Sequence, residues 1–141
     1  MNRPARSLCP IALALDLFGD AWSLLVVRDL MFKGISGYNG FLAAGEGIAT
    51  NVLSDRLAKL EDAGIIDKRR DPSDKRRFVY GLTAKGADLA PVLVSMVLWS
   101  AKHTDTDAPQ DMVSAMATDP SGFAQAVIRR LTAAEGSEPS R

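Results

Sequence analysis

Two neighbouring segments constrain the fold of this chain more than any other feature of its sequence. In the first, over 50–63, Leu53, Leu57 and Leu60 recur at i, i+4 and i+7, and Gly64 follows directly. This spacing predicts an α-helix with one apolar face, ended by a glycine that accepts the left-handed conformation. Such a helix buries its leucines against other elements and leaves the opposite, polar side facing solvent.

The second segment, over 65–82, predicts a β-hairpin. Residues 65–70 and 77–82 have the composition of strands, and Asp71-Pro72-Ser73-Asp74 between them favours a tight turn. Positive charge gathers here although the net charge of the chain is zero; the cations are Lys68, Arg69, Arg70, Lys75, Arg76 and Arg77. A local basic cluster indicates an anionic partner, and a solvated loop is the alternative interpretation.

Helical periodicity and capping residues predict further helices on both sides of this pair. They are expected at 10–17, 21–32, 39–44, 84–103 and 111–117, with a last helix that begins at Pro120. Asp20, Asn39 and Thr83 stand where the N-caps of the second, third and fourth of these helices belong. Pro91 is expected to kink the long fourth helix. The predicted fold class is therefore mainly α with a small two-stranded β wing.

A polar helix face beside a basic hairpin is the arrangement that a DNA-binding winged helix-turn-helix needs. The recognition helix of this motif enters the major groove, and the hairpin places cations along the phosphate backbone. Asn51 can pair bidentately with adenine, and Asp55 can accept a hydrogen bond from cytosine. The candidate DNA-contacting residues are Thr50, Asn51, Ser54, Asp55, Arg56, Lys59, Lys75, Arg76 and Arg77.

Two alternatives stay open for this helix. The first is that it is an ordinary surface helix. The second concerns Arg56, which either reaches a phosphate or pairs with Asp55, Glu61 or another acid.

Several motifs occur in the order found in one bacterial family. They are Cys9-Pro10-Ile11-Ala12, Gly19-Asp20-Ala21-Trp22-Ser23-Leu24-Leu25, Leu53-Ser54-Asp55-Arg56-Leu57, Ala63-Gly64-Ile65-Ile66 and Tyr80-Gly81-Leu82-Thr83-Ala84-Lys85-Gly86. In these the chain resembles the HxlR-type winged-helix regulators, which are MarR-like in architecture, from residue 9 to about 100. It departs from the family pattern at Tyr38-Asn39-Gly40-Phe41 and at Ala49, both close to the DNA-facing unit.

The resemblance implies a homodimer that binds a partly palindromic double-stranded DNA operator, as a repressor. It also implies that the N-terminal and C-terminal helices form the dimer surface, and the apolar composition of 87–131 agrees with this. The expected organisation is a winged helix-turn-helix domain with dimer helices at its ends over 8–103, a C-terminal helical extension over 104–134 and a disordered tail over 135–141.

Three residues are candidates for sensing an effector. Cys9 stands at the start of the first helix, where backbone N–H groups and the helix dipole favour a thiolate, and some relatives sense electrophiles, quinones or oxidants through a cysteine at this point. The alternative is a small packing residue at a subunit contact. Trp22 and Trp99 are core or interface residues, and an effector pocket is expected near them and Cys9.

Other function classes lack support in the sequence. One histidine and one cysteine provide no convergent acid–base set, so an enzyme is not expected; neither is a metal or a cofactor. A single cysteine allows no intramolecular disulfide, and no signal peptide or membrane-spanning segment is recognisable, so we expect a cytoplasmic protein. A non-DNA-binding helical interaction module is the remaining alternative, but such a module would not need the basic hairpin.

Overall fold

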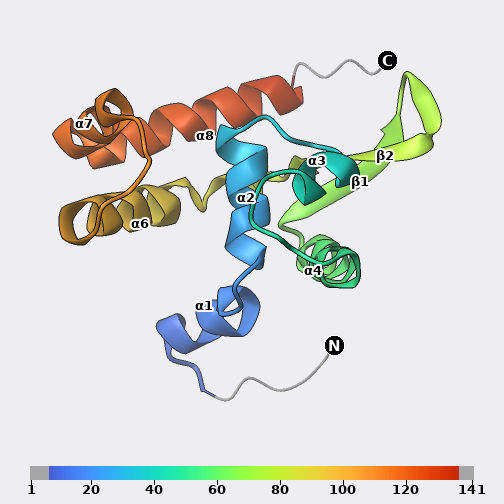
Figure 1. The fold of residues 1–141 in the computed structure, drawn as a ribbon, viewed down its shortest axis with the longest axis horizontal. Coiled ribbons are helices and arrows are strands. Elements are labelled where there is room, and N and C mark those ends of the chain that lie inside the picture. Colours follow the sequence, from blue (N-terminus) through green and yellow to red (C-terminus); the bar gives the residue numbers. More distant parts are fainter. Residues whose placement is uncertain (1–6, 137–141) are drawn as a thin grey trace. The chain divides into compact units, whose positions relative to one another are not determined.

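The computed structural model describes residues 7–136, and the chain divides into two compact units. The first unit ends at Gly81 and the second begins at Leu82. Figure 1 shows the order of the elements, and each unit is described here by itself. The sequence predicted a different division, with one domain over 8–103 and an extension over 104–134, and this division stays a prediction. Residues 137–141 of the expected tail lie outside the described part of the chain.

The first unit is a small helical domain with a β-hairpin. Its elements are α1 (Pro10–Phe18), α2 (Ser23–Phe32), α3 (Tyr38–Leu42), α4 (Thr50–Asp62), β1 (Ile66–Asp71) and β2 (Asp74–Leu82). Helix α4 packs against α2, α3 and β1. The buried apolar side chains of this unit are Val26, Val27, Met31, Phe41, Leu53, Leu57, Leu60, Ile65 and Ile66. The hairpin is therefore attached to the same core that holds α4.

The ends of α4 agree with the sequence. The predicted helix over 50–63 is confirmed within one residue as Thr50–Asp62. Gly64 adopts a φ of 77°, a backbone conformation that costs a glycine little and that turns the chain from α4 into β1. The predicted hairpin is also confirmed, with Pro72 and Ser73 as the two residues between the strands.

The start of α3 differs from the prediction. Gly37, and not Asn39, is the N-cap residue, and Asn39 lies inside the helix. The loop before α3 pairs with the hairpin, because Gly37 bridges to Val79 and the Tyr80 amide donates to the Ser36 carbonyl at 2.8 Å. This pairing fixes where the loop ends, so the helix begins earlier than its polar residues indicate.

The second unit consists of four helices. They are α5 (Ala84–Ala87), α6 (Ala90–His103), α7 (Gln110–Thr118) and α8 (Pro120–Gly136). Helix α8 packs against α5, α6 and α7. The buried apolar side chains are Ala87, Ala90, Leu93, Val94, Met116, Ala124 and Val127. Asp119 accepts a hydrogen bond from the Gly122 amide at 3.1 Å, as expected for the residue that caps α8.

The prediction of one kinked helix ending at His103 was wrong. Thr83 does act as a cap, accepting from the Gly86 amide at 3.1 Å, but the helix it caps, α5, ends at Ala87. A new helix, α6, begins at Ala90, and Pro91 lies in its first turn. A proline there loses no hydrogen bond, because the first amides of a helix have no intrahelical acceptor. Pro91 therefore starts a helix instead of bending one.

Within residues 7–136, no single helix is both long enough and apolar enough to cross a membrane. Helices α1 and α2 meet the length and composition criteria only when taken together, and they are bent by 82° at the break between them.

Candidate nucleic-acid interface

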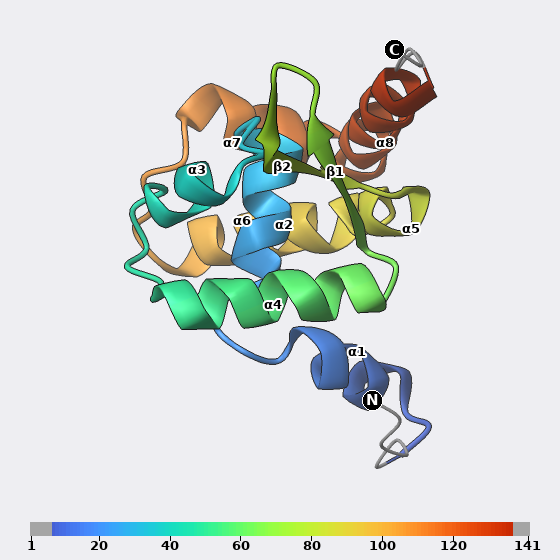
Figure 2. The same ribbon diagram turned by 90° about the vertical axis from the view of Figure 1, so that its right-hand side faces the viewer.

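Helix α4 has one buried and one exposed face. Leu53 and Leu60 are fully buried and Leu57 is 3% exposed. The exposed side chains follow the opposite face, and they are Thr50, Asn51, Ser54, Asp55, Ala58, Glu61 and Asp62, while Arg56 and Lys59 are half-buried at the border. Figure 2 shows α4 running along one side of the first unit and leading at its C-terminal end into β1. The polar candidates of the recognition helix are thus brought together on one surface.

Tyr38 holds the start of α4. Its hydroxyl donates to the Thr50 carbonyl at 3.0 Å and lies 3.1 Å from the Ser54 hydroxyl. The N-cap residue of α4, Ala49, has no side-chain cap, and the Tyr38 hydroxyl, which bonds a carbonyl and not an amide, connects α3 to this helix end without capping it. Tyr38 is not among the site residues predicted from the sequence. The sequence feature that could have indicated this contact is a tyrosine at the start of the helix that precedes α4.

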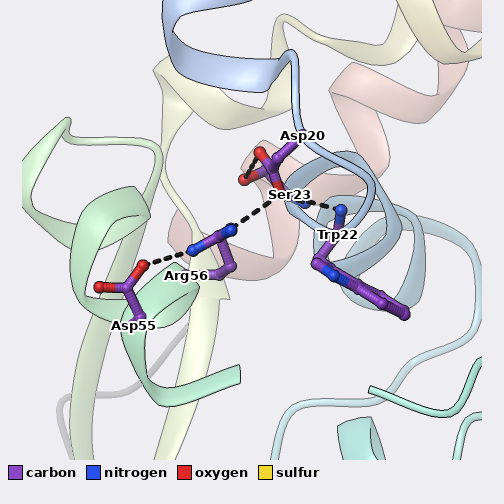
Figure 3. Close-up of polar contacts among 5 residues, drawn as sticks. All are labelled: Asp20, Trp22, Ser23, Asp55 and Arg56. Carbon is purple, nitrogen blue, oxygen red and sulfur yellow. Dashed lines mark hydrogen bonds and ion pairs between the residues drawn. The ribbon is translucent and has the colours of Figure 1, made fainter. Parts of the chain in front are cut away.

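Arg56 pairs with acidic residues, one of the two alternatives that the sequence left open. Its Nε donates to Asp20 Oδ2 at 2.8 Å, and its Nη1 contacts the Asp55 carboxylate. Figure 3 shows the guanidinium between the two carboxylates. Asp20 lies in the loop between α1 and α2, so the pair connects that loop to α4. A contact between Arg56 and DNA stays a prediction.

Asp20 also caps α2. Its carboxylate accepts from the Trp22 amide at 2.8 Å, the Ser23 amide at 3.0 Å and the Ser23 hydroxyl at 2.6 Å. Burial by itself would raise the pKa of Asp20. The hydrogen bonds from the Ser23 hydroxyl, from Arg56 and from the two amides outweigh it and hold the pKa far below its ordinary value. The carboxylate therefore stays ionised.

A second ion-pair cluster fixes the turn between α3 and α4. Arg28, on α2, donates from Nη1 to Glu46 Oε2 at 2.8 Å and from Nε to Asp29 Oδ1 at 2.9 Å. Asp29 is 3% exposed. Burial would lower the pKa of Arg28, but its bonds to Glu46 and Asp29 raise it. Sequence reasoning missed this cluster, because residues 28 and 46 are far apart along the chain.

The hairpin presents exposed cations. Lys75, Arg76 and Arg77 are exposed on β2, and the Arg76 side chain retains 89% of its accessible surface although its Nε lies 3.1 Å from Asp74. Ser73 donates from its amide and its hydroxyl to Asp71, both at 2.9 Å, which closes the turn. The structure therefore places these three predicted site residues together at the start of β2, next to the tight turn.

The hairpin also carries Lys68 and Arg70 on β1, which belong to the basic cluster of the sequence but are not among the predicted DNA-contacting residues. Lys68 Nζ and the Arg70 guanidinium lie 4.6 Å and 4.4 Å from the centre of the Phe78 ring. A recess of about 530 Å³ lies between residues 36–39 and the strand residues 76–80. Cation–π contacts of this kind restrict the long side chains, and the alternating pattern of β2 did not indicate them.

The three candidate sensing residues lie at different places. Cys9 is exposed and directly precedes α1, and its amide donates to the Ser7 hydroxyl at 2.9 Å. Trp22 is half-buried in the first unit, and Trp99 is 65% exposed on α6 in the second. The effector pocket expected near all three stays a prediction. In the described part of the chain, no group of three or more His, Cys, Asp or Glu residues is arranged to hold a metal ion.

Comparison with known sequences identifies a family. The model of the HxlR-like helix-turn-helix family matches residues 17–108. The chain is 42% identical over 89 residues to sll1512 of Synechocystis, 37% identical over 90 residues to Rv3095 of Mycobacterium tuberculosis and 32% identical over 99 residues to YvaP of Bacillus subtilis. These matches cover 63%, 64% and 70% of this chain. They span 65% and 56% of the first two relatives and 91% of YvaP. All three are named as uncharacterized HTH-type transcriptional regulators, not enzymes.

Comparison with solved structures gives the same fold. The chain is similar to the putative transcription factor PA1607 at 33% identity and a TM-score of 0.65, covering 74% of this chain and 72% of that one. It is similar to the redox regulator HypR at 26% identity and a TM-score of 0.61, covering 70% and 100%. The predicted mainly helical fold with a two-stranded wing is confirmed. On the extent of the family match, this chain belongs to the HxlR-like helix-turn-helix family.

Proposed function

We propose that this chain is a DNA-binding transcriptional regulator that reads an operator with the exposed face of α4. The observation that carries the proposal is that face itself. Asn51, Ser54 and Asp55 are exposed together, while the leucines opposite them are buried. Short polar side chains in the N-terminal half of a helix can reach base edges in the major groove.

The wing supplies the charge that phosphate binding requires. Exposed arginines and lysines lose few internal contacts when they bind phosphates, and release of counterions favours the complex. The three exposed cations on β2 follow α4 closely in sequence and belong to the same unit. Membership of the helix-turn-helix family and the names of the relatives support this function.

Selection of bound fragments from genomic DNA tests the proposal. The wild-type protein should enrich a small set of partly palindromic sequences, and its affinity should fall steeply as salt rises. Asn51→Ala should weaken binding to the enriched site, whereas Gln125→Ala, on an exposed position of α8, should not. If no fragment is enriched, the alternative of a helical interaction module that does not bind DNA is favoured.

We also propose that the functional unit is a homodimer, and the support is exposed apolar surface on α1 and α6. Ile11 and Leu15 are 71% and 54% exposed, and Val92, Met96 and Trp99 are 45%, 49% and 65% exposed. Apolar stripes on helices favour burial against a partner, and family resemblance assigns the dimer surface to the terminal helices. A two-fold dimer would place its recognition helices about 34 Å apart, one turn of DNA.

Sedimentation velocity tests the dimer. Trp99→Asp should shift the protein from dimer to monomer at micromolar concentration and weaken operator binding. Ser114→Asp, at an exposed position on α7, introduces the same charge and should leave the dimer intact. A wild-type protein that sediments as a monomer at all concentrations contradicts the proposal.

Repression is the proposed outcome of operator binding, on family resemblance. A reporter driven from the enriched operator should rise when the gene for this protein is deleted. A reporter that falls on deletion would show activation.

A response to oxidants or electrophiles is a second proposal, centred on Cys9. The chain is 27% identical to YodB of Bacillus subtilis, whose reduced form is solved, and structures of diamide-treated and quinone-bound YodB also match. Cys9 is exposed where α1 begins. In a dimer, two Cys9 thiols can form a disulfide, with diamide accepting the two hydrogens. The alternative is a packing role at the subunit contact.

Operator binding before and after treatment separates these two roles of Cys9. Diamide or a quinone should weaken binding by the wild type and have no effect on Cys9→Ser. Unchanged binding after mass spectrometry has verified modification of Cys9 would refute the sensor.

A further inference from the structure

We propose that Asp20 is a positioning residue for DNA binding, whose carboxylate fixes Arg56 and through it the DNA-facing side of α4. The proposal rests on the function proposed above, because it concerns how the same helix is held. If the proposal holds, a negatively charged carboxylate next to the DNA-binding helix strengthens binding to DNA, although DNA is itself a polyanion.

The geometry gives Asp20 two sets of partners. Oδ1 and Oδ2 accept three hydrogen bonds from Trp22 and Ser23, which belong to the start of α2. Oδ2 also accepts from Arg56 Nε at 2.8 Å. The Asp20 side chain is 19% exposed and that of Arg56 is 23% exposed. The carboxylate is thus held by the first turn of one helix while it binds a side chain of another.

The contact continues to the exposed face of α4. Arg56 also binds Asp55, whose side chain is 68% exposed. Figure 3 shows the order Asp20, Arg56, Asp55. Asp55 is the candidate acceptor for a cytosine amino group, so its orientation matters for base reading. A guanidinium fixed by Asp20 presents its remaining N–H groups to Asp55 in a defined direction.

A direct phosphate contact by Arg56 makes the opposite prediction for Asp20. If Arg56 bound a phosphate, Asp20 would compete for it, and removing the carboxylate would free the guanidinium. Removal of an acidic group near DNA would also strengthen the long-range attraction. Both effects tighten binding. A positioning role predicts weaker binding, so the sign of the change separates the two roles.

Asp20→Asn is the main variant. The side-chain oxygen of asparagine can still accept from the Trp22 and Ser23 amides that Asp20 binds, so these contacts at the start of α2 are retained, but its neutral amide is a weaker partner for Arg56. Fluorescence anisotropy with the enriched operator should show an affinity loss of about tenfold, within the range of measured coupling between contacting residues. The dependence of log K on log salt should not change, because no phosphate contact is lost.

Asp62→Asn is the matched control. It removes the same charge from the exposed side of α4 at a position outside the cluster of Asp20, Arg56 and Asp55, and its affinity should stay equal to that of the wild type or rise. The double variant Asp20→Asn/Arg56→Gln should bind no more weakly than Arg56→Gln alone, because Asp20 acts through Arg56.

Arg56→Gln keeps the proposal testable if Asp20→Asn fails to fold. A positioning role predicts that Arg56→Gln loses affinity with an unchanged salt slope. A phosphate contact predicts a slope that is smaller by about 0.9. Circular dichroism and thermal unfolding establish that each variant is folded.

The outcomes also separate this proposal from the proposed function. A wild-type protein that enriches no DNA refutes the function. A wild type that binds its operator, together with a folded Asp20→Asn that binds equally well or better, leaves the function intact and refutes the positioning role.

Discussion

Neutralising the wing should change the salt dependence of DNA binding more than it changes the fold. Arg76→Ala/Arg77→Ala removes two exposed cations from β2. The Arg76 side chain is 89% exposed, and its ion pair with Asp74, at 3.1 Å, lies at the surface. Exposed pairs of this kind contribute little to stability. The variant should therefore unfold at nearly the temperature of the wild type.

The size of the effect follows from counterion release. Each phosphate contact contributes about 0.9 to the slope of log K against log salt, so two lost contacts reduce the slope by about 1.8. Between about 50 and 200 mM salt, a fourfold change, this slope difference alters the affinity ratio by roughly tenfold. The variant should bind much more weakly than the wild type at low salt, and the gap should narrow as salt rises.

Anisotropy titrations at four or five salt concentrations measure the two slopes. Lys102→Ala/Arg129→Ala removes the same charge from exposed positions in the second unit and is the matched control, which should keep the wild-type slope. The reasoning is refuted if the wing variant also keeps that slope, or if the control loses as much of it as the wing variant does.

Three further predictions concern stability. Leu60→Ala, at a fully buried position of α4, should cost about 2–5 kcal/mol in urea unfolding through the cavity it leaves, and a cost below about 1 kcal/mol would contradict the assigned core. Thr83→Ala removes the cap of α5 and should cost about 1 kcal/mol, while Thr83→Ser should retain most of the stability. The pKa of Asp20 is lowered in the folded chain, so its contribution is complete above the ordinary carboxylate pKa and is lost as the pH falls below it. Asp20→Asn should therefore be less stable than the wild type near neutral pH, with a gap that narrows below about pH 4; a gap that is constant in acid would be evidence against this.

The recognition helix and the wing could be predicted because both are local in sequence. Leu53, Leu57 and Leu60 define a helix face by spacing alone, and Gly64 ends the helix at its left-handed position. The turn at Asp71 is likewise determined by its own residues. Patterns of this kind need no knowledge of distant contacts.

The features that were missed depend on distant residues. The start of α3 at Tyr38 is set by the pairing of the preceding loop with β2, which lies more than 40 residues further along the chain. The ion pair between Asp20 and Arg56 joins residues 36 positions apart. The break before Ala90 separates α5 from α6 where the apolar periodicity runs on without interruption. Periodicity indicates whether a segment is a helix or a strand, but it does not indicate the contacts that decide where the element begins and ends.

Site-directed crosslinking to DNA tests the central claim most directly. In a Cys9→Ser background, Asn51→Cys places a thiol on the exposed face of α4, and Gln125→Cys places one on α8 as the control. Operator DNA with a thiol tethered to a base in the major groove should form a disulfide with the protein carrying the change at position 51 and not with the control. Equal crosslinking of both variants, or none at position 51 under conditions where the operator is bound, would contradict the assignment of α4 as the DNA-reading helix.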